Sequence, residues 1–111
     1  MTNQTSHDAY FTQLSSAMRT AGLHRPTMLL DLDRLDRNID RVAGSIPDHL
    51  NFRVVAKSLP SPQLLDYVTS RAQTNRLMVF HQPFLNQLAA TQPDKDLLIG
   101  KPFPVGAAAR F

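Results

Sequence analysis

The sequence predicts an α/β fold in which strands and helices alternate along a parallel sheet. Short apolar runs alternate with amphipathic segments, the loops between them are short, and the apolar runs suit strands covered on both faces. A closed barrel of eight such units takes about 250 residues, whereas the chain has 111. We therefore expect either a small open sheet or a partial (β/α) TIM-type barrel, with about three to four strand–helix units after an N-terminal helix. The last segment reads as a helix that is only beginning, which favours the partial barrel.

Residues 1–24 are predicted to form a helical lead-in to the main region, residues 25–111. Apolar side chains recur at helical spacing over Asp8–Thr20. Ser6 or Asp8 is the expected cap, and the helix is expected to end near Gly22.

The apolar run from Thr27 to Asp33 is predicted to form the first strand. It leads into the clearest helix of the chain, residues 34–46, with Asp33 as the expected acceptor at the start of that helix. The apolar residues of this helix recur at steps of four, three and four: Leu35, Ile39, Val42 and Ile46.

Three further strands are predicted over residues 51–57, 76–81 and 96–100. Helices are expected over residues 63–72 and 83–91. The first of these helices has Ser61 as its N-cap and Pro62 in its first turn. Residues 105–111 have the pattern of a helix that begins.

Composition excludes several classes of site. The chain has no cysteine, which rules out disulfides and thiolate chemistry. The net charge of +3 comes from scattered Arg and Lys, so nucleic-acid binding is not expected. No apolar run approaches the ~18 residues of a spanning helix, and no signal peptide precedes the first helix. We expect a cytoplasmic protein that binds no membrane. Nucleotide-binding and serine-hydrolase motifs are absent.

Ligands of parallel α/β folds bind at the carboxyl ends of the strands, where the predicted polar residues are Asp33, Lys57, His81 and Lys101. Lys57 directly follows the apolar residues VVA. Partial desolvation at such a rim disfavours the charged form of a lysine, and the neutral amine is the form that attacks a carbonyl. A lysine can also simply end a strand by reaching into water. The residues alone do not separate Lys57 from Lys101.

His81 is a candidate for the same strand mouth, or else a loop residue satisfied by the backbone. No histidine has metal-ligand spacing to a carboxylate, so no metal site is expected in this chain. The acidic residues of the first strand and helix alternate with arginines, and we interpret them as a solvated, ion-paired face: Asp31, Asp33, Asp36 and Asp40.

Two stretches carry a resemblance to a known family. RPTMLLDLDRLDRNIDRVA, followed by FRVVAKSLPSPQLLDYV, resembles the N-terminal part of the fold-type III pyridoxal-phosphate enzymes, the alanine racemase N-terminal domain superfamily. The resemblance is closest to the D-threonine aldolase and D-serine dehydratase-like group. It covers Arg25 to about Gln73, and it implies that Lys57 carries pyridoxal 5'-phosphate as a Schiff base. The KTHK-like sequence typical of D-threonine aldolases is replaced here by KSLP.

The resemblance implies the N-terminal part of an enzyme that acts on a D-amino or 3-hydroxy amino acid as an aldolase, dehydratase or racemase. In that family, later barrel strands hold the phosphate and a second domain supplies the opposing acid/base. The chain alone is therefore expected to be poorly active, with Lys57 more exposed than in a whole enzyme. KSLP is also similar to the SKTxP of pyridoxal-phosphate homeostasis proteins. This leaves a non-catalytic cofactor-binding module, or a non-functional truncated product, as alternatives. Open sheet edges also make a homo-oligomer an expectation to test.

Overall fold

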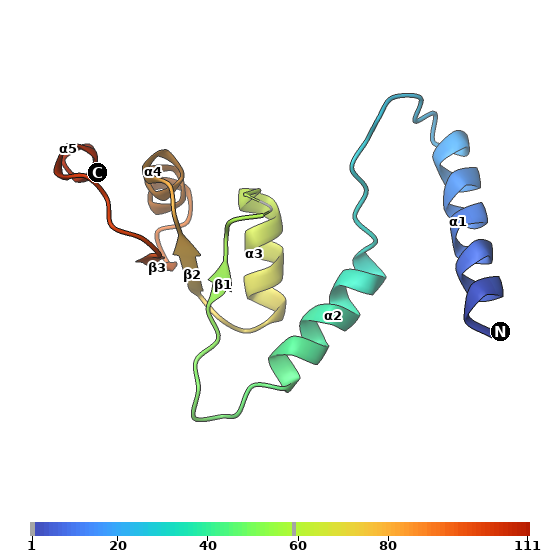
Figure 1. Ribbon diagram of the computed structural model, residues 1–111, viewed down its shortest axis with the longest axis horizontal. Coiled ribbons are helices and arrows are strands. Elements are labelled where there is room, and N and C mark those ends of the chain that lie inside the picture. Colours follow the sequence, from blue (N-terminus) through green and yellow to red (C-terminus); the bar gives the residue numbers. More distant parts are fainter. Residues whose placement is uncertain (1, 59) are drawn as a thin grey trace. The chain divides into compact units, whose positions relative to one another are not determined.

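The computed structural model describes residues 2–58 and 60–111 (Figure 1). Its internal contacts divide the chain into two units, one ending at Leu30 and the other running from Asp31 to Phe111. The first unit contains helix α1 (Thr2–Thr20), which begins earlier than the sequence predicted. No proline or glycine between residue 2 and Asp8 interrupts it. It ends at Thr20, close to the predicted end near Gly22, and the φ of +70° at Gly22 is the left-handed geometry that favours glycine after a helix.

The predicted strand over residues 27–33 is wrong. Residues 27–31 form no strand, and helix α2 (Leu32–Gly44) begins inside the predicted segment. The reason is the cap: the Asp31 side chain accepts a hydrogen bond from the Arg34 backbone N–H at 3.0 Å, which starts the helix there. Asp33 therefore lies in the first turn of α2, neither at a strand end nor at the cap.

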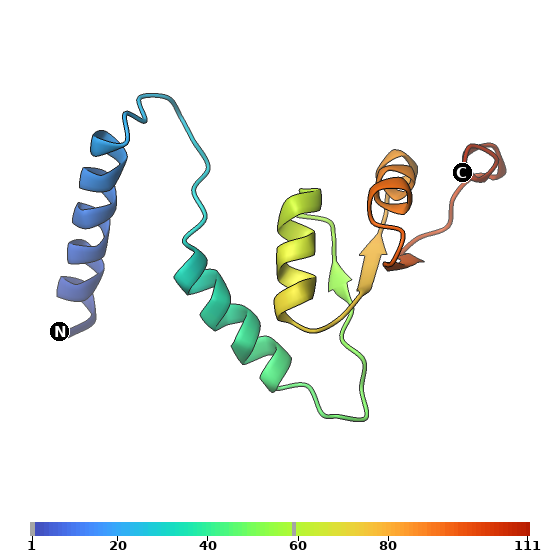
Figure 2. The same ribbon diagram turned by 180° about the vertical axis from the view of Figure 1, so that it is seen from behind.

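The second unit contains three strand–helix pairs after α2. They are β1 (Val54–Val55), α3 (Pro62–Arg71), β2 (Arg76–Val79), α4 (Gln82–Thr91), β3 (Asp96–Ile99) and α5 (Val105–Ala108). The strands form a parallel sheet in the order β1-β2-β3, which can be followed from both sides in Figures 1 and 2. The predicted cap of α3 is confirmed, because Ser61 Oγ accepts a hydrogen bond from the Leu64 N–H at 3.3 Å.

Helices α3 and α4 pack on the same face of this sheet. The buried core joins side chains of the strands to side chains of both helices: Ala56, Leu65, Leu77, Val79, Leu85 and Leu88. Leu77, Val79 and Leu88 have no exposed surface. Alternate residues of a strand point to opposite faces. The side chains of Arg76, Met78 and Phe80 therefore project away from the helices.

Arg71 links α2 to α3. Its guanidinium bonds to both oxygens of Asp40, at 2.9 and 2.8 Å, and pairs with Asp36 at 3.0 Å. The hydrogen bond from Arg71 holds the pKa of Asp40 below its usual value. Tyr67 donates a hydrogen bond to Asp36 at 2.7 Å, which raises the tyrosine pKa. Asp36 and Asp40 are therefore ion-paired, and their partner Arg71 belongs to α3 rather than to their own helix.

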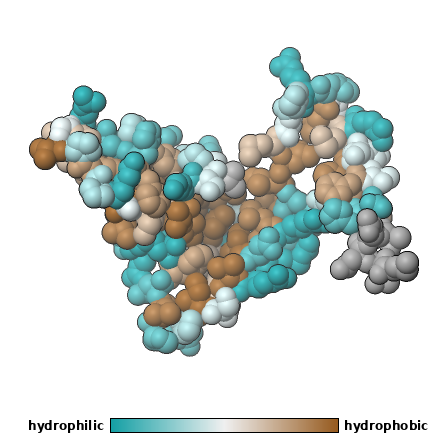
Figure 3. All heavy atoms as spheres, viewed as in Figure 1, coloured by the Kyte–Doolittle hydropathy of each residue, from teal (hydrophilic) through white to brown (hydrophobic). Residues whose placement is uncertain are grey.

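The other face of the sheet, which we call the open face, carries Val55, Met78 and Leu98. Val55 is 53% exposed and Leu98 is 44% exposed. In Figure 3, apolar residues gather over the region of the strands. The apolar part of the open face thus lies next to the carboxyl ends of the strands, where the sequence analysis predicted the candidate site.

Candidate functional site

Three rows of side chains cross the open face, because register-paired residues of a parallel sheet point to the same side. From the amino to the carboxyl ends of the strands, the rows are Arg53, Arg76 and Asp96, then Val55, Met78 and Leu98, then Lys57, Phe80 and Gly100. The register pairs Val55 with Met78 and Met78 with Leu98. The Gly100 N–H donates to the Val79 carbonyl at 2.8 Å and so continues the ladder beyond β3.

Lys57 lies at the carboxyl end of β1, where the sequence placed it. Ala56, immediately before it, is 5% exposed, and its N–H donates to the Met78 carbonyl at 2.9 Å. This bond fixes the backbone on which the lysine stands. The Lys57 side chain itself is exposed, and its Nζ lies over the Phe80 ring, 5.3 Å from the ring centroid. Such a cation–π contact orients an ammonium group at an exposed site.

Phe80 is the residue of this site that the sequence prediction missed. A Cβ placed on Gly100 would come within 2.9 Å or less of three carbons of the Phe80 ring. Only a glycine leaves room for the ring in this position. Phe80 therefore lies between Lys57 and Gly100, in the middle of the carboxyl-end row. The signal for it was the alternation along RLMVFH, which places Phe80 on the face opposite to Leu77 and Val79.

His81 and Lys101 lie at the same end of the sheet but do not join Lys57. His81 is the N-cap residue of α4; its carbonyl accepts a hydrogen bond from the Leu85 N–H at 2.9 Å, and its exposed side chain makes no capping bond. Lys101 is exposed in the bend after β3. Over residues 2–58 and 60–111, no hydrogen bond or ring contact connects either side chain to Lys57.

The opposite end of the open face is closed by an ion pair. Arg53 bonds to both carboxylate oxygens of Asp96, at 3.0 and 3.1 Å, and also donates to the Leu77 carbonyl at 2.9 Å. The hydrogen bond from Arg53 lowers the pKa of Asp96. Arg76 pairs with the same carboxylate at 3.6 Å. The charges at this end are thus paired with one another, whereas the amine at the carboxyl end faces an aromatic ring.

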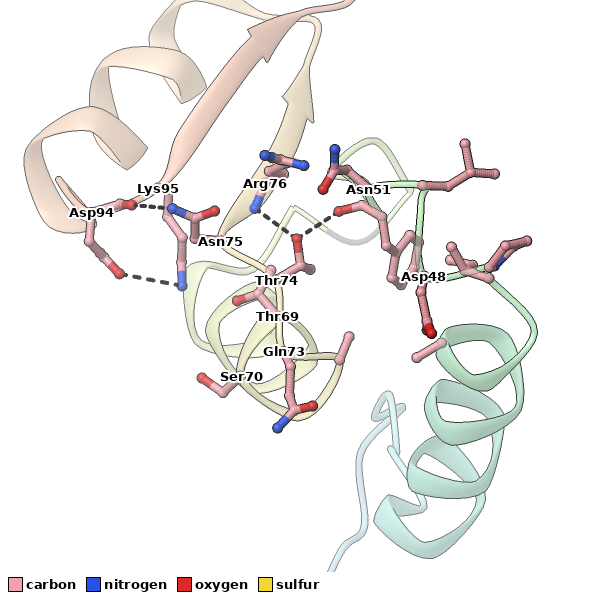
Figure 4. A pocket seen from close by; sticks show the side chains of 16 residues that line it. Asp48, Asn51, Thr69, Ser70, Gln73, Thr74, Asn75, Arg76, Asp94 and Lys95 are labelled. Carbon is pink, nitrogen blue, oxygen red and sulfur yellow. Dashed lines mark hydrogen bonds and ion pairs between the residues drawn. The ribbon is translucent and has the colours of Figure 1, made fainter.

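A polar cavity of about 690 Å³ lies at the amino ends of the strands (Figure 4). Several of its polar groups bond to one another or to the nearby backbone. Thr74 Oγ1 donates to the Phe52 carbonyl at 2.6 Å and accepts from the Arg76 N–H at 3.2 Å, and the Asn75 amide donates to the Asp94 carbonyl at 3.1 Å. The carboxyl ends of the strands, where ligands of parallel α/β folds bind, lie at the opposite end of the sheet.

A second cavity, of about 490 Å³, lies between α4, β3 and α5 and is lined mostly by apolar side chains. Neither Lys57 nor His81 borders it. It is continuous with the helix-covered face of the sheet, since Leu85 and Leu97 belong both to its lining and to the packed core. It is therefore separate from the carboxyl-end row.

The comparisons with known proteins add no relative to this picture. No family model, no curated protein and no solved structure matches the chain. Among the residues that the structure describes, no helix is long and apolar enough to cross a membrane. In the same part of the chain, no three His, Asp, Glu or Cys side chains gather as a group that could hold a metal ion. The candidate functional site is therefore the carboxyl-end row of the open face, Lys57, Phe80 and Gly100.

Proposed function

We propose that the chain is the first part of a pyridoxal-phosphate-binding (β/α) barrel in which Lys57 forms the covalent bond to the cofactor. One observation carries the proposal: the exposed amine of Lys57 stands at the carboxyl end of a parallel sheet, beside the ring of Phe80. Carboxyl strand ends are where ligands of parallel α/β folds bind. The family resemblance of the LDLDRLDRNI and VVAKSLP segments supports the same assignment.

The order of the sheet supports the barrel part of the proposal. Consecutive strands are neighbours, β1-β2-β3, and both crossover helices pack on one face. A barrel is wound in this way, with helices outside and the other face turned inward, whereas a doubly wound sheet has helices on both faces. The open face, with its rows of charged, apolar and aromatic side chains, then corresponds to the inner wall.

The residues present fit the reactive end of the cofactor. Lys57 offers an exposed amine, and Phe80 offers an aromatic surface beside it. Gly100 leaves the space that the Phe80 ring occupies, because a Cβ there would displace the ring. When bound, pyridoxal phosphate supplies an aldehyde for a lysine and an electron sink for negative charge at the α-carbon of an amino acid. Lys57 Nζ would hold the cofactor through its aldehyde carbon and would be the amine nearest to move a proton at that α-carbon. The substrate class we propose is a D-amino or 3-hydroxy amino acid.

A cofactor-binding module without turnover is the second candidate, and one observation favours it for this chain alone. The neighbours of Lys57 in its row are Phe80 and Gly100, and neither can act as an acid or a base. Efficient proton transfer on both faces of a substrate needs a second such group. We therefore propose covalent cofactor binding with little or no turnover for the 111-residue chain, in a cytoplasmic setting.

Absorbance spectra test the proposal. The wild-type chain, Lys57→Ala and Lys101→Ala are each mixed with pyridoxal phosphate, and the band of the lysine-bound cofactor is recorded. Lys101→Ala is the matched control, because Lys101 is also an exposed lysine after a strand. We expect the band in the wild type and in Lys101→Ala and its loss in Lys57→Ala. Equal spectra for all three proteins would refute the assignment of Lys57.

A further inference from the structure

The Phe80 ring lies beside the atom of Lys57 to which a carbonyl compound would be attached. The ring centroid is 5.3 Å from Nζ, and the carbonyl carbon of an aldehyde that reacts with the lysine sits one bond from Nζ. In an aromatic aldehyde the ring is attached to that same carbon. A ring attached there can reach the 4.5–7 Å range over which two aromatic rings attract each other. An aliphatic aldehyde has no such ring to offer.

The residues around Phe80 restrict where its ring can lie. It directly follows Val79, which is fully buried, and it is itself partly buried. On one side its ring fills the space over Gly100, where a Cβ would come too close to three of its carbons. On the other side stands Lys57. A fixed aromatic surface next to a reactive amine discriminates between ligands better than a mobile one, because less conformational freedom is lost on contact.

We propose that Phe80 is a specificity-determining residue that makes Lys57 react preferentially with aromatic aldehydes. The inference rests on the proposed function, since it requires Lys57 to form a covalent bond with carbonyl compounds. It goes further in naming the residue that selects the class of carbonyl compound. An aromatic pair of this kind favours the aromatic ligand by roughly two- to tenfold.

The reaction itself is a condensation. The ammonium group of Lys57 first loses a proton to the buffer, and the nitrogen lone pair then forms a bond to the aldehyde carbon. The two remaining hydrogens on nitrogen leave with the aldehyde oxygen as water, and a carbon–nitrogen double bond remains. Borohydride adds hydride to that carbon, the nitrogen takes a proton from water, and the resulting amine is permanent. Phe80 takes no part in these bond changes and acts only through contact with the ring of the aldehyde.

The test compares two aldehydes at two lysines of the same molecule. The full chain is treated separately with pyridine-4-carboxaldehyde and with butanal, reduced with borohydride and digested, and the modified fraction at Lys57 and at Lys101 is measured by mass spectrometry. Lys101 is exposed and serves as the internal reference for the intrinsic reactivity of each aldehyde. In the wild type we expect the aromatic-to-aliphatic ratio at Lys57 to exceed that at Lys101 by roughly two- to tenfold.

Variants assign the preference to the ring. In Phe80→Leu the ratio at Lys57 should fall to that at Lys101, whereas Phe80→Tyr, which keeps a ring, should retain it. Phe84→Leu removes a ring that packs on the core instead and should leave the ratio unchanged. If Phe80→Leu does not fold, Gly100→Ala provides a second test, because its Cβ displaces the Phe80 ring; the ratio at Lys57 should again fall.

Two kinds of failure are distinguishable. A Lys57 that reacts, but with the same ratio in wild type, Phe80→Leu and Gly100→Ala, overturns the role of Phe80 and leaves the proposed function intact. A Lys57 that reacts with neither aldehyde, while Lys101 reacts with both, overturns the proposed function and the inference together.

Discussion

Gly100 and Phe80 fit against each other at the carboxyl end of the sheet. Gly100 follows β3 and has no side chain, and the ring of Phe80, which follows β2, fills the space beside it. A Cβ at position 100 would lie within 2.9 Å or less of the ring carbons Cδ1, Cε1 and Cζ. This pair decides where the aromatic surface beside Lys57 stands. It also explains why a glycine occurs at an exposed position that has no positive φ.

Gly100→Ala is expected to destabilise the fold by about 1 kcal/mol or more, because the Phe80 ring must move away from the added methyl group. Phe80→Leu should reduce that cost, since a smaller side chain leaves room for the methyl group. Thermal unfolding of both single variants and the double variant measures the coupling. Strictly additive effects would show that the two residues do not contact each other in solution.

Leu88→Ala is expected to destabilise the fold by about 2 to 4 kcal/mol, because Leu88 is fully buried in the core. Leu98→Ala is the matched control on the open face and should cost under about 1 kcal/mol, since its side chain is already 44% exposed. Chemical denaturation gives both values. A cost for Leu98→Ala as large as that for Leu88→Ala would mean that the open face is covered in solution, for example by a second copy of the chain.

Asp31→Ala is expected to destabilise helix α2 by about 1 kcal/mol, because the variant loses the cap that accepts the Arg34 N–H. Asp33→Ala should have a smaller effect, since Asp33 lies in the first turn, where a carboxylate interacts favourably with the helix dipole but accepts no capping bond. Circular dichroism during thermal unfolding compares the two variants. A larger loss of stability for Asp33→Ala than for Asp31→Ala would indicate that Asp33 is the cap, as the sequence predicted.

Acid should weaken the fold through Asp96. The hydrogen bond from Arg53 lowers the pKa of Asp96 in the folded chain below the ordinary value of 3.8. The stability that this carboxylate contributes is therefore complete above about pH 4 and is lost as the pH falls through the folded-state pKa. Unfolding temperatures measured from pH 6 to pH 2 should fall less steeply for Asp96→Asn than for the wild type. Parallel curves would show that the pair contributes nothing to the pH dependence.

Local sequence signals predicted much of the fold. The Ser61 and Pro62 signal gave the start of α3, and the apolar runs gave β1, β2 and β3 close to their observed positions. The strand predicted over Thr27 to Asp33 was wrong because an apolar segment is compatible either with a strand or with an extended segment that leads into a helix. The capping bond of Asp31, which decides between them, depends on backbone geometry.

The rest of the site depends on contacts between distant residues. The position of Lys57 after β1 follows from its place behind VVA. Its contact with Phe80 requires the register that pairs Val55 with Met78, and the fit of Phe80 on Gly100 requires the register of β2 with β3. The ion pairs of Arg71 with Asp36 and Asp40 likewise join residues some thirty positions apart. No pattern within one segment specifies such pairings.

Identification of the lysine that reacts with pyridoxal phosphate tests the central claim most directly. The chain is incubated with pyridoxal phosphate, reduced with borohydride and digested, and the peptide that carries the added group is sequenced by mass spectrometry. We expect the modification on Lys57, at a higher fraction than on Lys95 or Lys101, the other two lysines of the chain. An even distribution over the three lysines, or a preference for Lys101, would contradict the assignment of Lys57 as the cofactor-binding residue.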